Sequence, residues 1–248
     1  MTALLEVRGL RKAYGALAVT DGVDLDVSPG EIHALIGPNG AGKTTFISLL
    51  AGEVRPDAGT IRLGGADITA LPVHRRAQAG LARSFQITSV VPSFSARENV
   101  ALALQGADGP SFRLLPAPRA ERHRTEAADA LLARVGLAGR GERPAAVLSH
   151  GEKRALELAM ALALKPRLLL LDEPMAGTGP EESRAMVDLI AGLKADCAIL
   201  LVEHDMDAVF RLADRVSVLV SGRVIASGTP EAVRADAAVR TAYLGDEA

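Results

Sequence analysis

The segment "GPNGAGKTT", from Gly37 to Thr45, constrains the fold of this chain more than any other feature. It matches the pattern G-x-x-x-x-G-K-[ST] at every fixed position, with an apolar strand, "EIHALIG", before it and a helical stretch, "FISLLAG", after it. A strand that runs through a glycine loop into a helix brings backbone N–H groups and the positive end of a helix dipole to one place. The segment therefore predicts a phosphate-binding loop in an α/β domain.

Each residue of this loop has a predicted part in binding a nucleoside triphosphate. Lys43 is expected to reach the β- and γ-phosphates, and the hydroxyl of Thr44 is expected to bind Mg²⁺. The rest of the predicted ATP-binding loop comprises Gly37, Pro38, Asn39, Gly40, Ala41, Gly42 and Thr45. The alternative, a glycine-rich turn with a surface lysine, does not account for the strand and the helix on either side. The motif leaves open what the triphosphate does.

The rest of the chain indicates an α/β protein that is interrupted in the middle. "VDLDV" (Val23 to Val27) alternates at period two, and "GTIRLGGADI" carries Gly64-Gly65 between apolar runs, which predicts a hairpin. From about residue 89 to 143 the pattern is helical and polar, with a Gly- and Pro-rich insertion at 105–119. After Pro166 the apolar runs "RLLLLDE" and "CAILLVEH" flank a helical segment, as expected for a parallel sheet covered on both faces.

Two adjacent acids and a histidine are predicted to complete the site. Asp172 ends a buried strand, at the edge where open α/β sheets bind ligands, and would hold Mg²⁺ through water. Glu173 would point the other way and polarise the attacking water. His204 ends the next apolar strand, in "LLVEHD", where it could contact the γ-phosphate and orient Glu173 or the water. A solvated strand end is the alternative for the acids, and a solvated or capping side chain is the alternative for His204.

A second polar segment, "LSHGE", opens a run of strong helix formers, "KRALELAMALAL". Ser149 and Glu152 form the pattern S-x-x-E, which predicts a capping box, and Lys165-Pro166 ends the run. The capped helix would expose N–H groups and positive potential at its start, which suits a phosphate group.

The composition excludes several classes of protein. The formal net charge of -2 gives no electrostatic argument for a nucleic-acid partner, and we expect none. The single cysteine, Cys197, cannot form an internal disulfide, which fits a reducing compartment. Glu6 and Arg8 interrupt any secretory signal, and the apolar tracts are too short to span a bilayer. We therefore expect a globular cytosolic protein.

Taken in order, the phosphate loop, "LSHGE", "LLLLDEP" and "EHD" resemble the motifs of the ATP-binding subunit of ABC transporters, over nearly the whole chain. The resemblance implies a P-loop NTPase fold of ABC type. This fold is α/β, with a mostly parallel core sheet, an N-terminal antiparallel β region and an inserted helical subdomain. It also implies one ATPase domain, with its core at 1–86 and 166–228, a helical subdomain at 87–165 and a C-terminal helical tail at 229–248.

The resemblance assigns further roles by position. Tyr14 would stack on adenine, with ordinary packing as the alternative, and Gln86 in "RSFQ" would reach Mg²⁺ and water. The segment Ser149, His150, Gly151 and Glu152 matches the signature loop, which in this family completes the ATP site of the other subunit. The resemblance thus implies a head-to-tail dimer with two ATPs between its halves, and a second ATPase subunit that is identical or paralogous.

The sequence departs from the family pattern at two places. His150 replaces the first glycine of the signature, and it could be merely a solvated residue. Gly179, in "MAGTG" after Pro174, stands where the family usually has an aspartate. The second departure puts in doubt any contact across the dimer that the carboxylate would make. Neither removes a predicted ATP or Mg²⁺ residue, so hydrolysis is still expected.

Within the family, the region around the signature and the terminal "YLGDEA" look most like subunits that import branched-chain amino acids. This implies an ATPase on the cytoplasmic face of the inner or plasma membrane, with two permease subunits and, indirectly, a periplasmic or extracellular substrate-binding protein. Importers of urea and short amides look similar. Soluble ABC ATPases and non-hydrolysing modules are further alternatives, which the single cassette and the intact Lys43, Asp172, Glu173 and His204 disfavour.

Overall fold

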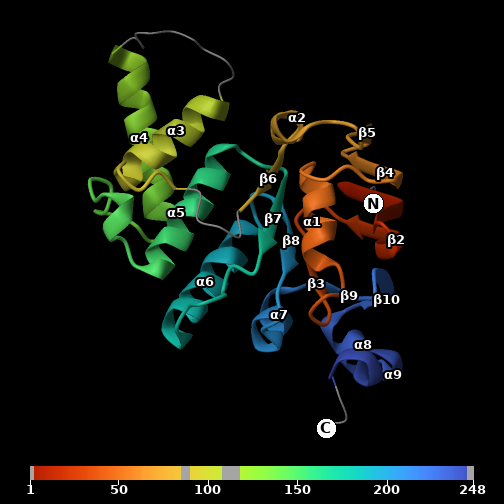
Figure 1. The fold of residues 1–248 in the computed structure, drawn as a ribbon. Coiled ribbons are helices and arrows are strands. Elements are labelled where there is room, and N and C mark those ends of the chain that lie inside the picture. Colours follow the sequence, from red (N-terminus) through yellow and green to blue (C-terminus); the bar gives the residue numbers. More distant parts are fainter. Residues whose placement is uncertain (1–2, 85–89, 108–117, 245–248) are drawn as a thin grey trace.

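The computed structural model describes residues 3–84, 90–107 and 118–244, which form two sheets with helices around them (Figure 1). The larger sheet has the strand order β10-β9-β3-β8-β7-β6. Its strands are β3 (Ile32–Ile36), β6 (Leu81–Arg83), β7 (Leu168–Asp172), β8 (Ala198–Val202), β9 (Arg215–Val220) and β10 (Arg223–Gly228). All neighbours are parallel except β9 and β10, which pair as an antiparallel hairpin. Every residue of β3, β7 and β8 is buried, which explains why their sequences are continuously apolar.

The smaller sheet is antiparallel and has the order β2-β1-β4-β5. Its strands are β1 (Leu5–Tyr14), β2 (Leu17–Val27), β4 (Ala58–Leu63) and β5 (Ala66–Asp67). The period-two pattern of "VDLDV" lies in β2, where it buries one face. The predicted hairpin at Gly64-Gly65 is confirmed, since β4 and β5 pair on either side of it. The mostly parallel sheet and the N-terminal antiparallel region thus agree with the fold predicted from the sequence.

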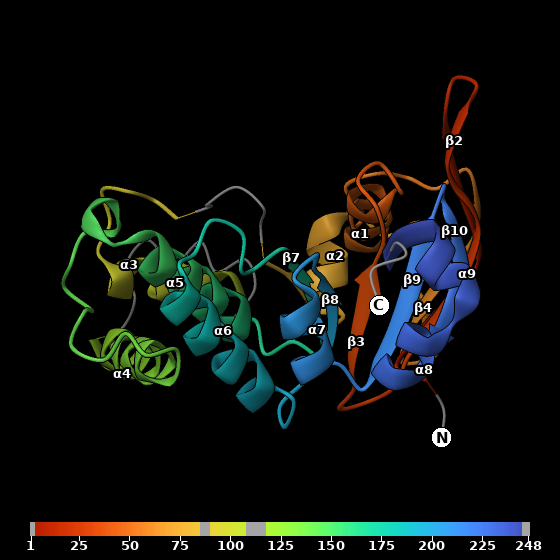
Figure 2. The same cartoon turned by 90° about the horizontal axis from the view of Figure 1, so that it is seen from below.

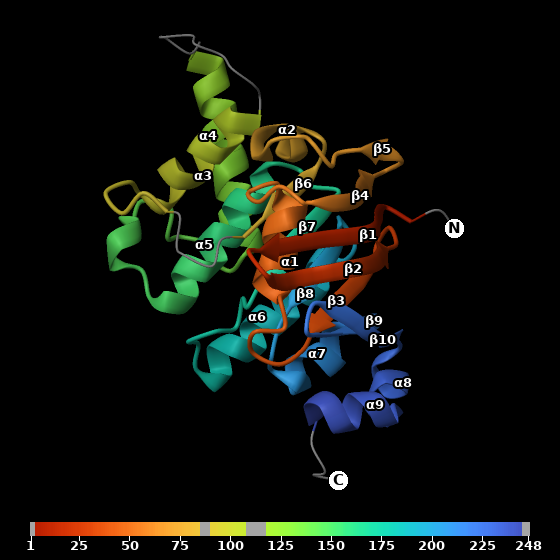
Figure 3. The ribbon, with the colours of Figure 1, turned by 45° about the vertical axis from the view of Figure 1, so that its right-hand side comes forward.

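Helix α1 (Lys43–Ala51) lies between the two sheets (Figure 3). Its side chains Phe46, Ile47, Leu49 and Leu50 are fully buried and share one core with apolar residues of both sheets. Burial of this kind stabilises a Leu or Phe side chain by about 1.5–3 kcal/mol, so α1 and the loop before it are held firmly.

A buried arginine closes the C-terminal end of α1. Arg76, on α2 (Val73–Gln78), is 1% exposed and donates hydrogen bonds from Nη1 to the carbonyl oxygens of Leu49 and Leu50, both at 2.7 Å. A helix leaves its last carbonyls unpaired and carries negative potential there, which a guanidinium group satisfies. The carbonyls of Leu49 and Leu50 therefore have a protein partner without solvent.

The opposite face of the large sheet is covered by α6 (Pro180–Leu193) and α7 (Met206–Leu212), whose apolar side chains share a second core with β7 and β8. The edge of the sheet at β9 and β10 is covered by α8 (Pro230–Ala235) and α9 (Ala237–Val239), and a last helical turn over Arg240–Leu244 follows α9. The sheet is therefore covered on both faces, as the apolar strands predicted.

The remaining helices form a lobe beside the sheets, as Figures 1 and 2 show. They are α3 (Ala96–Ala107), α4 (Pro118–Arg134), a short 3₁₀ turn (Ala145–Val147) and α5 (His150–Ala163). All of them lie within residues 87–165, the range predicted for the helical subdomain. The centre of the predicted Gly- and Pro-rich insertion lies outside the described residues. Among the residues that the structure describes, no helix is both long and apolar enough to cross a bilayer.

Candidate functional site

The loop from Gly37 to Thr45 connects β3 to α1, as predicted. Backbone atoms of neighbouring segments lie so close to it that two of its positions have no room for a side chain. A Cβ atom at Gly37 would lie 2.0 Å from the carbonyl oxygen of Leu219. A Cβ atom at Gly42 would lie 2.4 Å from the carbonyl oxygen of Val19. Both glycines also have positive φ angles, +153° and +103°. Glycine is therefore required twice over at these positions, by space and by conformation.

The turn between β9 and β10 supports the same loop from outside the motif. Gly222 donates its N–H to the carbonyl of Ala41 at 2.9 Å and accepts a hydrogen bond from the N–H of Asp21 at 2.8 Å. A Cβ atom at Gly222 would lie 2.6 Å from the oxygen of Val19, the same atom that excludes a side chain at Gly42. The loop is thus fixed between the antiparallel sheet and this hairpin.

The start of α1 is suited to phosphate. Its N-cap residue, Gly42, provides no side-chain hydrogen bond, and the first turn contains no acidic residue. The first N–H groups of a helix have no partner within the helix and lie at its positive end. Thr44 is exposed beside them. The residues present therefore fit a triphosphate and leave the Thr44 hydroxyl accessible to a cation.

Lys43 is 7% exposed and turns back onto its own loop. Its Nζ donates to the carbonyl oxygens of Gly37 at 2.7 Å and Pro38 at 3.1 Å. Burial lowers the pKa of Lys43, while the charges of Glu173 and Asp172 act in the opposite direction. The lysine therefore already stands in the loop, and two backbone carbonyls hold its charge.

Asp172 ends β7 and is 1% exposed. One carboxylate oxygen, Oδ2, accepts a hydrogen bond from Arg83 Nη2 at 3.0 Å, whereas Oδ1 is buried without a hydrogen-bond partner among the described residues. Burial raises the pKa of Asp172, and Arg83 opposes that rise. A buried carboxylate oxygen with no protein partner fits a hydrated cation, because hard cations such as Mg²⁺ prefer oxygen ligands and keep several waters.

Glu173 changes direction directly after the strand. Its φ is +50°, a left-handed conformation that costs a residue with a side chain about 1–2 kcal/mol. Its N–H still bonds to the carbonyl of Val202 at 2.9 Å. The carboxylate is 29% exposed and lies 3.8 Å from His204 Nδ1. The strained turn thus places two neighbouring acids in different surroundings, one buried and one open to solvent.

The segment "EHD" contains a residue whose role the sequence did not reveal. Glu203 is fully buried, and its carboxylate accepts hydrogen bonds from the N–H groups of Met175 at 3.0 Å and His204 at 2.9 Å. Glu203 therefore connects the turn that contains His204 with the loop that follows Glu173.

The prediction that His204 ends its strand is wrong by two residues, because β8 ends at Val202.

Tyr14 lies at the end of β1, in a hairpin that extends beyond the rest of the molecule (Figure 2). The residue is 52% exposed, and Lys12 Nζ lies 5.5 Å from the ring centroid. The alternative of a core tyrosine is therefore wrong. Stacking on adenine stays a prediction. Gln86, the other residue assigned by resemblance alone, lies outside the described residues.

The predicted capping box at the start of α5 is confirmed. Ser149 Oγ accepts a hydrogen bond from the N–H of Glu152 at 3.2 Å, and Glu152 Oε2 accepts one from the N–H of Ser149 at 2.9 Å. The hydroxyl hydrogen of Ser149 is not used in the cap, so it can still donate to an anion. Arg140 Nε lies 3.2 Å from Glu152 Oε1. His150 and Gly151 form the first turn of the helix, as the sequence indicated.

Sequence reasoning also missed Arg83, which connects two parts of the site. Its Nη1 donates to Glu53 Oε2 at 2.5 Å, while Nη2 bonds to Asp172. It lies three residues before Gln86 in "RSFQ". An arginine that ends a short apolar segment, "GLAR", is a weak signal by itself.

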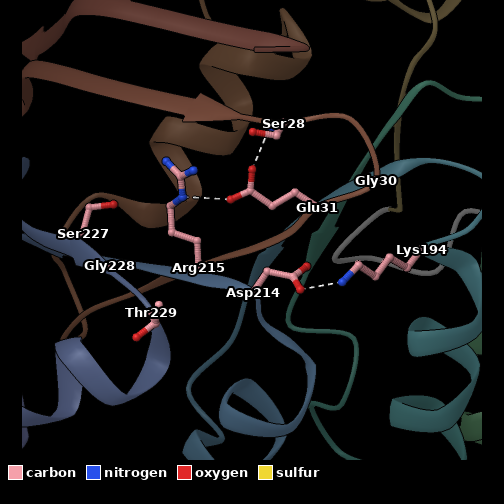
Figure 4. Close-up of a pocket in the computed structure, with 9 residues that line it drawn as sticks. All are labelled: Ser28, Gly30, Glu31, Lys194, Asp214, Arg215, Ser227, Gly228 and Thr229. Atoms are coloured by element: carbon pink, nitrogen blue, oxygen red, sulfur yellow. Dashed lines mark hydrogen bonds and ion pairs between the residues drawn. The ribbon is translucent and has the colours of Figure 1, made fainter. Parts of the chain in front are cut away.

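A cavity of about 560 Å³ lies at the ends of the parallel strands that are farthest from the phosphate loop, beside the starts of β3 and β9 (Figure 4). Arg215 Nε lies 2.9 Å from Glu31 Oε1, and Lys194 Nζ donates to Asp214 Oδ1 at 2.5 Å. The charges on its walls are thus paired with one another. Since the phosphate loop follows the other end of β3, this cavity is separate from the candidate nucleotide site.

Comparisons with known proteins agree with this geometry. The model of the ABC transporter family matches residues 20–176, and that of the branched-chain amino acid ATP-binding cassette transporter matches residues 223–248. The high-affinity branched-chain amino acid transport ATP-binding protein BraF of Pseudomonas aeruginosa is 39% identical, over 98% of each chain. The lipopolysaccharide export system ATP-binding protein LptB of Acidithiobacillus ferridurans is 38% identical, over 100% of this chain and 99% of the other. Among solved structures, an ATP-binding cassette of an ABC transporter in its ADP conformation gives a TM-score of 0.86 at 26% identity, over 99% of this chain and 100% of that one.

Proposed function

The chain belongs to the ABC transporter family of ATP-binding proteins and is an ATPase, and we propose that it drives an importer of branched-chain or other hydrophobic amino acids. The observation that carries the substrate class is the match of residues 223–248 to the branched-chain amino acid family. This segment lies outside the motifs that all ABC ATPases share, so its match carries information beyond ATP binding. The full-length similarity to BraF supports the same class.

ATP would be held by the loop from Gly37 to Thr45, with its adenine on Tyr14. Lys43, whose Nζ now donates to the carbonyls of Gly37 and Pro38, would donate to the β- and γ-phosphate oxygens instead. Asp172 Oδ1, Thr44 and Gln86 would hold Mg²⁺, with Asp172 acting through water. When bound, the ion neutralises charge on the phosphates.

Glu173 would orient and polarise the attacking water. Its position supports this role, because the carboxylate is open to solvent and lies one residue from the buried Asp172. His204 would contact the γ-phosphate and keep Glu173 in place. The imidazole is 59% exposed and lies 3.8 Å from the carboxylate, so a small side-chain movement on ATP binding would join the two groups.

The signature loop from Ser149 to Glu152 would bind the ATP of a second subunit. We propose a head-to-tail dimer with two ATPs, paired with two membrane permeases and, indirectly, with a substrate-binding protein outside the membrane. This assembly would place the chain at the cytoplasmic face of the membrane as a peripheral subunit. The exposed Ser149 hydroxyl and the start of α5 support the proposal, since both can donate to a γ-phosphate presented from outside the chain.

Lipopolysaccharide export is the second candidate, because LptB is nearly as similar to this chain as BraF. The two functions differ in cargo and direction. Reconstitution of the ATPase with its permeases and binding protein in liposomes, followed by uptake of radiolabelled leucine, separates them. We expect ATP-dependent uptake of leucine that unlabelled isoleucine or valine suppresses. Failure of leucine, isoleucine and valine to enter, in liposomes where the complex hydrolyses ATP, would reject the proposed cargo but not the ATPase.

A further inference from the structure

One departure from the family pattern, His150, contacts the loop that contains the other, Gly179. His150 Nε2 lies 3.4 Å from the carbonyl oxygen of Ala176, within the loop that leads to Gly179. A Cβ atom at Gly177 would lie 3.3 Å from the same nitrogen. The imidazole of the signature loop thus lies against the loop that lacks the usual aspartate.

The chemistry of this contact fixes the form of the imidazole. A carbonyl oxygen only accepts hydrogen bonds, so His150 Nε2 must carry the hydrogen when the bond forms. The peptide N–H of Ala176 in turn donates to the carbonyl of Glu173 at 3.1 Å. Two hydrogen bonds therefore connect His150 to Glu173, and the backbone of Ala176 links one bond to the other.

Two further contacts hold the same loop. Its beginning is held by Glu203, which accepts a hydrogen bond from the N–H of Met175. Beyond its end, the first turn of α6 packs on the signature, where a Cβ atom at Gly151 would lie 2.9 Å from Glu182 Cδ. The loop is thus fixed at both ends, and His150 bonds to its middle.

We propose that His150 is a positioning residue that couples the signature loop to Glu173 of the same chain. The inference rests on the proposed dimer, in which the signature faces the partner's ATP and Glu173 faces this chain's own ATP. Engagement of the signature by the partner's nucleotide shifts the start of α5, and the bond from Nε2 to Ala176 transmits that shift to the loop after Glu173. His150 acts through this loop and not on the phosphate.

Three variants test the bond. In His150→Gln the side-chain amide nitrogen can take the place of Nε2, in His150→Asn the amide is too short to do so, and His150→Ala removes the donor. We expect the Ala and Asn variants to lose about 3–10-fold in the kcat for ATP hydrolysis with KM changed by less than about 2-fold, as the loss of one hydrogen bond implies, and the Gln variant to retain activity. His74→Ala, an exposed histidine on α2, is the matched control.

A second measurement separates coupling from direct binding of the partner's ATP. In a Glu173→Gln background, where ATP is not consumed, His150→Ala should still form the ATP-dependent dimer in size-exclusion chromatography. Loss of that dimer would mean that His150 binds the partner's phosphate, which overturns the proposal. Equal activity in all three variants, or equal loss in all three, would overturn it as well. Both measurements use the ATPase without permeases or cargo, so a failed uptake assay would leave this comparison intact.

Discussion

Asp172 and Glu173 are chemically similar neighbours with opposite surroundings. The left-handed backbone at Glu173 ends the strand direction, so one carboxylate stays buried against Arg83 while the next one meets solvent and His204. Strain of this kind persists only where the surrounding structure enforces it, and it concentrates at functional sites. Here the Glu203 carboxylate accepts a hydrogen bond from the N–H of Met175, and the Val202 carbonyl accepts one from the N–H of Glu173, and these bonds enforce the turn.

The Glu173→Gln variant tests the role of the exposed acid. The amide has the same shape but cannot polarise water, so we expect ATP binding to persist while turnover falls by at least about 100-fold. ATP should also stabilise a long-lived dimer. Fluorescent-nucleotide binding and phosphate release measure the two effects. Turnover within about 5-fold of the wild type would remove Glu173 from the base role.

His33 provides a test of stability against pH. Its ring is 1% exposed, and burial lowers its pKa from 6.5 to about 4, although Glu31 favours the charged form. Nδ1 lies 2.9 Å from the carbonyl of Asp26, and Nε2 lies 2.8 Å from Ser217 Oγ. The unfolded chain binds a proton near pH 6.5 and the folded chain only near pH 4. The neutral ring thus makes its full contribution to the free energy of unfolding above pH 6.5, and this contribution is lost as pH falls toward 4.

We therefore expect the wild type to lose up to about 3 kcal/mol more unfolding free energy between pH 7 and pH 4 than His33→Gln does. Urea unfolding of both proteins at intervals of half a pH unit measures the difference. The comparison removes the common contribution of the carboxylates. Parallel stability curves for the two proteins would show that His33 is not the titrating group.

Helix α5 shows how one local structure can serve packing and function together. Its capping box satisfies two backbone N–H groups, while the Ser149 hydroxyl hydrogen and the positive end of the helix stay available. The sequence predicted this helix start correctly, because capping is a local property of a few residues. It did not predict the bond from His150 to Ala176, because that contact joins segments far apart in the chain.

Two substitutions at Ser149 separate the two uses of α5. Ser149→Ala removes the cap, so the free energy of unfolding should fall by about 1 kcal/mol. ATPase activity should fall as well. Ser149→Asp keeps a good capping side chain, so stability should stay within about 0.5 kcal/mol of the wild type. Its charge would repel the partner's γ-phosphate and lower ATPase activity by at least about 10-fold. Urea unfolding and ATPase assays measure the two effects, and an active Asp variant would contradict a phosphate-facing Ser149.

The same contrast between local and distant interactions explains which other parts of the structure could be predicted from the sequence. Strands β3, β7 and β8 were predictable from apolar runs, and the phosphate loop from its motif. Arg83 and Glu203 were not, since a charged residue beside an apolar run looks the same in sequence whether it is solvated or buried. Their roles depend on partners brought together by the parallel sheet, Asp172 for Arg83 and Met175 for Glu203.

At the scale of the molecule, the proposed dimer gives each chain two half-sites on different elements. The phosphate loop begins α1, between the sheets, whereas the signature begins α5 in the helical lobe (Figure 1). In that dimer a single chain would contribute to two nucleotide sites, and neither site would be complete without a partner.

Mixing two inactive variants tests that arrangement. Lys43→Ala destroys the loop half-site and Ser149→Asp the signature half-site, so a dimer of either variant contains no complete site. In a head-to-tail dimer of identical chains, the mixed dimer has one intact site. An equal mixture should then recover about a quarter of wild-type ATPase activity, because half of the dimers are mixed and each has one active site of two. Activity that stays at background while the wild type is active would contradict a dimer of identical chains.

The carbonyl oxygen of Val19 meets two glycines that are far apart in the chain, Gly42 of the phosphate loop and Gly222 of the hairpin between β9 and β10. In a library of random variants selected for growth, tolerance of substitution should follow this shared contact and not distance from the nucleotide. Substitutions at Gly222 should then be as rare among the surviving variants as substitutions at Gly42, although Gly222 lies outside every motif. A protein engineer who recombines segments from related cassettes should therefore take the residues around Val19, Gly42 and Gly222 from one parent.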